Sequence, residues 1–439
     1  MNITESHSSS EFKYKYILKN DRLVNYKRNN IVFCFTKKLK EIFLPQGYPE
    51  SVSNDYIEYQ IWDTIQALVS TITSTVANQA ILKGIGVGDD KATLLAATIT
   101  WIMKDGAGLV GRILFAYWKG TFLDCNCKRW RLFADVLNDI SIFLDILTSY
   151  LPQQMFICII CVTSVGRSIV GVAGGATRAA LTMHQARKNN MADVSAKDGS
   201  QESLSNLVGL LLNLVVISMV TDSPKLILAM VTMLIILHLY ANYRAVRSIC
   251  MSSFNQSRLH IVVRNWLESG NIYPVDQCNR IEPVWSGLSR YSVWNVSIGS
   301  SVTSLSRDMQ TQLLKGYSMY RNESYIILME YRNAASANAS ILLKTGSGHL
   351  EQLKAMFQLE IIDFLMSNKQ HCTSSPIGAN QVSNEICYTQ ESITNIMERS
   401  LTCCNNHFID FISSAEYEGW SFDPVLLGAD EWRIDGVTY

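Results

Sequence analysis

Long apolar stretches without charge dominate the middle of the chain. Four runs of 18 to 21 residues hold no Asp, Glu, Lys or Arg; they cover residues 64–82, 146–166, 203–221 and 226–243. A helix needs about 20 apolar residues to cross the hydrocarbon core of a bilayer. The pattern therefore predicts membrane-spanning helices, with Pro152 and Pro224 breaking or starting helices between the runs.

Basic residues are distributed unevenly around these runs. They gather before the third predicted pass, in the polar segment 178–202 and after the last run, whereas the turns around Pro152 and Pro224 offer only Lys225. Lys and Arg are enriched on the cytoplasmic side of membrane proteins. With residues 64–82 and 92–118 as the first two passes, the sequence predicts six passes and both termini on the basic side. The alternative is a soluble all-helical domain with unusually buried helices.

Three zones follow from this pattern: a basic leader (residues 1–55), a helical membrane domain (56–245) and a C-terminal domain (250–439). In the last zone, residues 325–330 and 340–344 form short apolar runs around a polar linker, which predicts a β-hairpin. Apolar residues at helical spacing predict helices over residues 350–365 and 390–411, and the polar stretch 367–384 predicts a surface loop. The fold class is mainly α, with a polytopic helical membrane domain followed by a smaller α+β soluble domain.

Composition narrows the class of protein. The 38 basic residues balance 38 acidic ones, which argues against a nucleic-acid partner. Apolar residues make up 48% of the chain and mean hydropathy is +0.09, which excludes disorder and a coiled coil. Eleven cysteines, some of them inside apolar runs, fit reduced thiols in an intracellular compartment better than a secreted disulfide framework.

Several polar and glycine-rich motifs in the helical zone are long enough to be specific. They read GVGDDKAT at residues 86–93, KDGAGLVGR at 104–112, KRWRLFAD at 128–135, AGGATR at 173–178 and HQARKNNMADVSAKDGSQE at 184–202. Over residues 56–266 the chain strongly resembles the root UVB sensitive family, and residues 240–247 and 431–433 look most like its animal members. The resemblance implies intracellular membrane association. It also implies links to vitamin B6 homeostasis and auxin transport, and it provides no catalytic residues.

The polar segment 178–202, which is predicted to be a loop between two apolar runs, is also the predicted ligand site. Its candidate binding residues are Arg178, His184, Arg187, Asn190, Asp193 and Lys197. The two guanidinium groups offer forked donors to a phosphate or carboxylate, and Gly174 and Gly175 permit close backbone approach. The alternative is a connecting loop whose basic residues only set topology and touch anionic headgroups.

Charged residues inside apolar segments form a second candidate group: Lys104, Asp105, Arg112, Asp135 and Asp139. Each such charge costs roughly 2.5–3.5 kcal/mol at a bilayer centre. Asp105 and Arg112 lie seven residues apart on one helix face, so they are expected to pair. Arg131, Asp135 and Asp139 also share one helix face. The carboxylates could relay protons or hold a cation, or Arg131 and Asp135 could form a structural i,i+4 ion pair; the ion pair is favoured.

Other motifs argue against an enzyme. Residues 106–111 match GxGxxG but lie in a helical run, so a small-residue helix contact is the better interpretation. The tail residues His371, Cys372, Cys387, Cys403, Cys404 and His407 have irregular spacing for zinc. No GxSxG, P-loop or HExxH motif is present. We therefore expect no catalytic residues, no metal and no cofactor.

These observations predict a non-enzymatic, multi-pass membrane protein that transports, senses or retains a small anionic metabolite. The vitamin B6 or auxin-like class of that metabolite comes from the resemblance. Expected partners are the lipid bilayer and either other family members or a second copy of the chain. The alternative is a membrane-anchored scaffold that recruits partners through its basic loops and C-terminal domain, although a scaffold does not need charges within residues 104–112.

Overall fold

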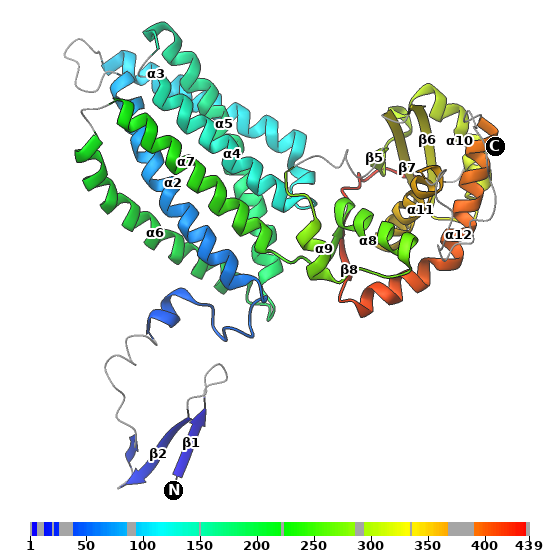
Figure 1. Ribbon diagram of the computed structural model, residues 1–439, viewed down its shortest axis with the longest axis horizontal. Coiled ribbons are helices and arrows are strands. Elements are labelled where there is room, and N and C mark those ends of the chain that lie inside the picture. Colours follow the sequence, from blue (N-terminus) through cyan, green and yellow to red (C-terminus); the bar gives the residue numbers. More distant parts are fainter. Residues whose placement is uncertain are drawn as a thin grey trace. The chain divides into compact units, whose positions relative to one another are not determined.

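The computed structural model describes residues 2–6, 13–19, 22–25, 38–85, 94–148, 151–220, 224–285, 294–333, 336–367 and 390–435. The chain divides into two compact units. The helical unit comprises residues 1–123 and 127–249, and the C-terminal unit comprises residues 124–126 and 250–439. The protein is mainly helical with a few small strands (Figure 1). The predicted loop at residues 367–384 lies, apart from Ser367, outside the described residues.

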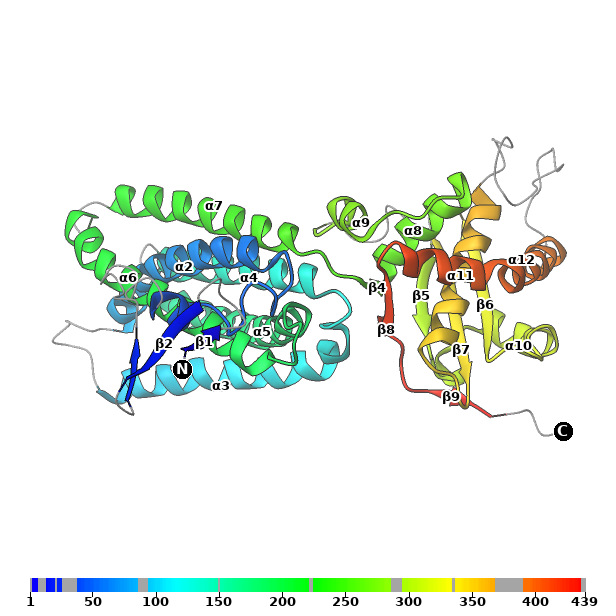
Figure 2. The same cartoon turned by 90° about the horizontal axis from the view of Figure 1, so that it is seen from below.

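Six long helices make up most of the described part of the helical unit (Figures 1 and 2): α2 (Tyr56–Ile85), α3 (Leu94–Lys119), α4 (Cys127–Leu147), α5 (Gln153–Gln185), α6 (Met191–Val220) and α7 (Pro224–Ser248). Pro152 is the N-cap of α5 and Pro224 is the first residue of α7, so both prolines start helices as predicted. This placement is favourable because proline at a helix start gives up an N–H that would have no intrahelical partner.

Helix α2 contacts α4, α6 and α7, and α5 contacts α3 and α4. The α3–α5 contact uses small residues. A Cβ on Gly108 would lie 2.7 Å from Ser164 Oγ, and one on Gly111 would lie 2.7 Å from Val165 Cγ1. The predicted small-residue contact is therefore confirmed for these two glycines, whereas Gly106 faces open space.

The outer faces of the bundle are apolar. Large hydrophobic side chains are exposed along α3, α6 and α7, including Leu94, Ile102, Leu109, Ile113, Trp118, Leu207, Leu211, Leu214, Met233 and Ile236. Among the described helices, residues Met155–Gln185 and Lys225–Ser248 are long and apolar enough to cross a membrane, by length and composition alone. The six-pass arrangement stays a prediction.

In the N-terminal zone a small antiparallel sheet joins β1 (Asn2–Ser6), β2 (Lys13–Lys19) and β3 (Arg22–Asn25). The sequence analysis assigned no strands to this zone. Its last residues pack on the helices: Val52 pairs with Ala186, and Val52, Tyr56 and Val194 form a buried cluster.

The C-terminal unit is built on a sheet of order β5 (Trp294–Ile298), β7 (Ser336–Lys344) and β6 (Tyr325–Asn333), with β9 (Arg433–Ile434) also pairing with β7. A second sheet joins β4 (Ser253–Asn255) and β8 (Ser421–Leu426). The helices are α8 (Gln256–Ser269), α9 (Val275–Ile281), α10 (Arg307–Met319), α11 (His349–Ser367) and α12 (Gln390–Tyr417). Strands β6 and β7 are antiparallel, so the predicted hairpin is confirmed, as are the two predicted helices.

One continuous hydrophobic core holds the C-terminal unit together and draws on its strands and on α8, α11 and α12. Several polar groups within it are paired. Arg258 is 1% exposed and its Nη1 donates to Glu282 at 2.8 Å. Gln358 donates to Tyr320 at 2.8 Å and accepts from Tyr325 at 2.9 Å. Buried polar groups need such partners because unpaired ones are costly in the interior.

Candidate functional site: a polar cavity in the helical unit

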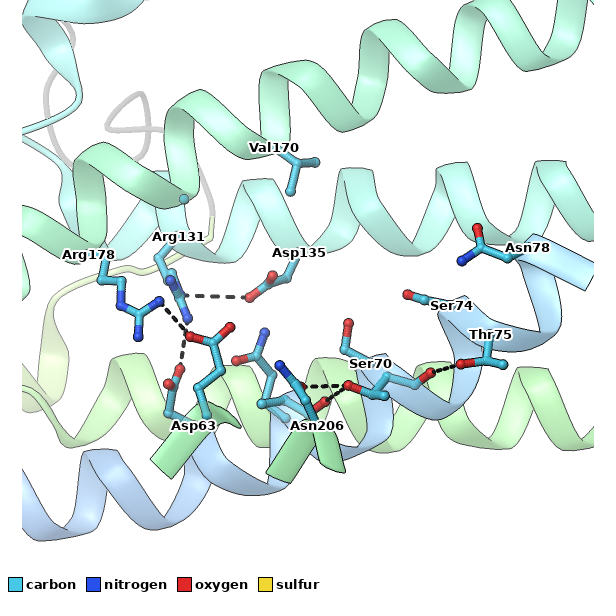
Figure 3. A pocket seen from close by; sticks show the side chains of 15 residues that line it. Asp63, Ser70, Ser74, Thr75, Asn78, Arg131, Asp135, Val170, Arg178 and Asn206 are labelled. Atoms are coloured by element: carbon cyan, nitrogen blue, oxygen red, sulfur yellow. Dashed lines mark hydrogen bonds and ion pairs between the residues drawn. The ribbon is translucent and has the colours of Figure 1, made fainter. Parts of the chain in front are cut away.

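The helical unit contains a partly open cavity of about 520 Å³ between α2, α4, α5 and α6 (Figure 3). Most of the side chains around it are polar. The lining residues are Asp63, Gln66, Ala67, Ser70, Thr71, Ser74, Thr75, Asn78, Arg131, Asp135, Val170, Gly174, Arg178, Glu202 and Asn206. A polar interior behind apolar outer faces is the reverse of what core packing alone would produce.

Helix α2 supplies one polar wall of the cavity. Gln66, Ser70, Ser74 and Asn78 recur every four residues and so lie on one side of the helix, where Thr71 and Thr75 adjoin them. In Figure 3, Ser74, Thr75 and Asn78 lie toward the opposite end of the cavity from Arg178. In the sequence, residues 64–82 stand out only as an uncharged run. The helical spacing of their amides and hydroxyls was a signal that could have identified this wall.

Ion pairs close one end of the cavity. Arg131 Nη2 donates to Asp63 Oδ1 at 2.8 Å, which ties α4 to α2, and Arg131 Nε lies 4.0 Å from Asp135 Oδ2 in an i,i+4 pair. Asn242 on α7 also donates to Asp135. Asp63, Arg131 and Asp135 converge in Figure 3. The predicted ion pair of Arg131 and Asp135 is therefore present, and it faces the cavity.

Arg178 extends the same polar end from α5. Its guanidinium contacts Asp198 Oδ2 and Glu202 Oε2 on α6, each at 2.6 Å. Burial raises the pKa of Asp198 and the nearby charge of Asp63 raises it further, while Arg178 opposes both effects. The guanidinium fork thus joins α5 to α6 by charge-assisted bonds at the edge of the cavity.

A second buried group lies behind the α2 wall. His238 on α7 is fully buried, and its Nδ1 lies 2.8 Å from Asp139 Oδ2 on α4. Its Nε2 lies 3.2 Å from Gln66 Nε2, and Gln66 lines the cavity. Asp139 is thus paired with a histidine that the sequence analysis did not select, and the pair connects to the cavity through one amide.

The segment 178–202 differs from the predicted loop. Helix α5 continues to Gln185 and α6 begins at Met191, so residues 186–190 alone connect the helices. The prediction of a long loop is wrong because charged residues can remain helical when neighbouring helices provide ion-pair partners. The two helices continue beyond their apolar runs, and their polar ends pack against residues 41–56.

Of the six predicted ligand residues, only Arg178 lines the cavity. His184 Nε2 lies 2.8 Å from Asp55, Asp193 accepts the backbone N–H of Gln46 at 2.6 Å, and Lys197 donates to the carbonyl of Glu41. Arg187 is exposed, and the Asn190 side chain accepts the backbone N–H of Lys188 at 3.1 Å. These residues attach the N-terminal segment or cap the connection, and the structure does not bring them together in one pocket.

The predicted intramembrane charges also separate. Asp135 lines the cavity and Asp139 lies in the buried pair described above, whereas Lys104, Asp105 and Arg112 lie on α3 away from it. The expected pairing of Asp105 with Arg112 is wrong, since Asp105 Oδ1 pairs with the adjacent Lys104 at 3.3 Å and Arg112 is exposed. A neighbour one residue away reaches Asp105 more readily than a side chain two turns along the helix.

The side chains around the cavity are suited to binding a small molecule through hydrogen bonds. Carboxylates, hydroxyls and amides around the cavity can donate to or accept from a small polar molecule. Within the described ranges no cluster of three His, Cys, Asp or Glu side chains could hold a metal ion. Three of the six tail residues with zinc-ligand chemistry, His371, Cys372 and Cys387, lie outside the described residues.

A helical bundle with a polar internal cavity, followed by an α+β unit, defines the class of this protein. Two family models match it: "Vitamin B6 photo-protection and homoeostasis domain" over residues 32–270 and "Root UVB sensitive protein, C-terminal" over residues 271–436. The chain belongs to the root UVB sensitive family, which confirms the resemblance found in the sequence. No solved structure matches the chain.

Relatives come from an amoeba and a plant. The chain is 43% identical over 281 residues to "RUS family member 1" of Dictyostelium discoideum, and the match covers 63% of this chain but 53% of that relative. It is 31% identical to "Protein root UVB sensitive 3" of Arabidopsis thaliana, over 99% of this chain and 94% of the relative. A third, "Protein root UVB sensitive 2, chloroplastic" from Arabidopsis, is 25% identical over 70% of this chain and 71% of that relative. The closer likeness to animal members stays a prediction.

Proposed function

We propose that the helical unit spans an intracellular membrane and holds a small polar metabolite of the vitamin B6 class in its cavity, as a transporter or receptor and not as an enzyme. The observation that carries the proposal is a polar, partly open cavity of about 520 Å³ between helices whose outer faces are apolar. The vitamin B6 class rests on the description of the family domain that covers this unit.

The apolar outer faces support the membrane. Leu94 is 86% exposed, Leu214 72% and Met233 63%, on three different helices. Soluble proteins seldom expose large continuous apolar patches, because contact of apolar surface with water is unfavourable. Lipid chains would cover these faces at no such cost. The two helices that are long and apolar enough to cross a bilayer agree with this proposal.

The cavity supports a small ligand. Its volume lies within the range of roughly 300–1,000 Å³ typical of small-molecule pockets. Membrane transporters place their sites between helices and line them with polar groups that the bilayer would otherwise exclude. The sequence favoured an anion because of Arg178 and Arg187. In the structure two carboxylates occupy the Arg178 fork and Arg187 is exposed, so the proposed ligand is polar without being restricted to an anion.

Filling the cavity tests the proposal. A Cβ on Gly174 of α5 would meet no atom within 4 Å, and Gly174 lines the cavity, so Gly174→Phe places an aromatic ring in the ligand space. Gly171 lies one turn earlier on α5, also in open space, and does not line the cavity. Gly171→Phe is therefore the matched control.

The full chain in lipid nanodiscs is titrated with pyridoxine by calorimetry. Wild type and Gly171→Phe should bind, and Gly174→Phe should lose at least tenfold in affinity, which is about 1.4 kcal/mol. Thermal unfolding of each variant checks that the fold survives. Absence of pyridoxine binding by the wild type, or equal binding by both phenylalanine variants, would contradict the proposal. A scaffold that only recruits partners would tolerate both substitutions equally.

A further inference from the structure

The charged end of the cavity contains more carboxylates than guanidinium groups. Arg131 faces Asp63 at 2.8 Å and Asp135 at 4.0 Å. Arg178 faces Asp198 and Glu202, each at 2.6 Å. Two positive charges are therefore shared among four carboxylates: the Arg178 fork holds two of them, and Arg131 is paired with the other two.

An added anion would enter an unfavourable field. To bind either guanidinium, a phosphate group would have to displace a carboxylate that now holds it, and it would still face the remaining carboxylates. Arg recognises phosphate strongly when its fork is available for parallel hydrogen bonds, and here both forks serve helix–helix contacts. Between helices, where the local dielectric is lower than in water, repulsion between like charges is less screened.

The same end of the cavity suits a different chemistry. The carboxylates of Asp63 and Asp135 can accept from a protonated nitrogen or a hydroxyl group. Farther along, the hydroxyls of Ser70 and Ser74 can bind further hydroxyl groups. A hydroxylated heteroaromatic ring with a protonated nitrogen is complementary to these groups in charge and in hydrogen-bonding capacity.

We infer that the cavity selects the unphosphorylated form of its ligand, a hydroxylated pyridine carrying a protonated ring nitrogen, and excludes the corresponding phosphate ester. This inference rests on the proposed function, because it assumes that the cavity is the ligand site. Beyond the proposed function, it specifies the charge of the ligand. It also makes Glu202 a specificity residue that keeps the Arg178 fork unavailable to phosphate.

The test compares pyridoxine with pyridoxine phosphate, which differ only in the phosphate group. Calorimetric titration of the full chain in nanodiscs of uncharged lipid should show pyridoxine binding at least tenfold tighter, about 1.4 kcal/mol. Glu202→Gln removes one negative charge and frees Arg178 Nη1 of its carboxylate partner. This variant should raise the affinity for the phosphate ester relative to pyridoxine.

Glu58→Gln is the matched control. Glu58 lies on the same unit but pairs with Arg244 at the surface, at 3.4 Å with both side chains exposed, and does not line the cavity. It should leave the ratio of the two affinities unchanged. If wild type binds the phosphate ester as tightly as pyridoxine, or if both glutamine variants shift the ratio equally, the inference is overturned while the proposed function stands. If neither compound binds, both fail.

Discussion

Replacing Arg178 by lysine should weaken the link between α5 and α6. The arginine fork holds Asp198 and Glu202 at 2.6 Å each, from a side chain that is 34% exposed. The compact ammonium of lysine keeps the charge but cannot reproduce the planar fork, so one of the two contacts is lost. Glu202 is the more exposed partner, at 41% against 8% for Asp198, and its bond is the one expected to break.

The expected cost is modest and measurable. A hydrogen bond to a charged group contributes about 1.5–3 kcal/mol when well shielded, and an exposed ion pair only about 0.2–1 kcal/mol. The half-exposed bond to Glu202 lies between these limits, so Arg178→Lys should cost about 1 kcal/mol. For a unit of this size that corresponds to roughly 2–4 °C in the unfolding midpoint.

The assay is thermal unfolding of the full chain in lipid nanodiscs, with hydrogen exchange of α5 and α6 to show where protection is lost. Arg187→Lys is the control, because Arg187 is exposed. A double-mutant cycle with Glu202→Gln should show coupling, since both substitutions weaken the same charge-assisted bond. The interpretation is wrong if Arg178→Lys matches wild type, if Arg187→Lys loses as much, or if the two changes at Arg178 and Glu202 are strictly additive.

Two further predictions concern packing and pH. Gly111→Ala should destabilise the helical unit by about 1–3 kcal/mol, because the new Cβ would lie 2.7 Å from a Val165 methyl group whose rotamer is restricted in a helix. Gly106→Ala, in open space, should instead stabilise by about 0.5–1 kcal/mol, and equal unfolding midpoints for the two variants would refute the α3–α5 contact. In the C-terminal unit, burial alone would lower the pKa of His260, but the adjacent carboxylates of Glu360 and an aspartate outweigh burial and raise the pKa. The pair of His260 and Glu360 should therefore stabilise the C-terminal unit fully below about pH 6.5, and this stabilisation should decline as the pH rises through the raised pKa of His260. Urea unfolding midpoints, followed by protease cleavage at acidic and basic pH, should show this pH dependence in the wild type and lose it in His260→Gln.

Local pattern predicted much of the fold. Pro152 and Pro224 start helices because the proline ring excludes the preceding turn from helix geometry, an effect confined to a few residues. The hairpin of β6 and β7 followed from two short apolar runs around a polar linker. Both signals are complete within one segment, so no distant part of the chain was needed to interpret them.

The candidate site required information that no single segment contains. Asp63 and Arg131 are 68 residues apart, and Asp139 and His238 are 99 apart, yet each pair is in contact. The sequence placed Arg178 in a loop with Arg187 and Lys197 because nearby charges suggested a common site. Their helices direct them differently, and only Arg178 reaches the cavity.

The sequence by itself determined the long apolar helical runs and the prolines that start two of the helices, because proline chemistry and hydrophobic patterning act over one or two turns. Only the tertiary structure decided that the α2 amides and hydroxyls face the charges of α4, α5 and α6 across one cavity. It also decided that each guanidinium there is already held by carboxylates from other parts of the chain. The physical reason is that electrostatic pairing depends on distance in space: side chains that are remote along the chain become neighbours only after the helices have packed.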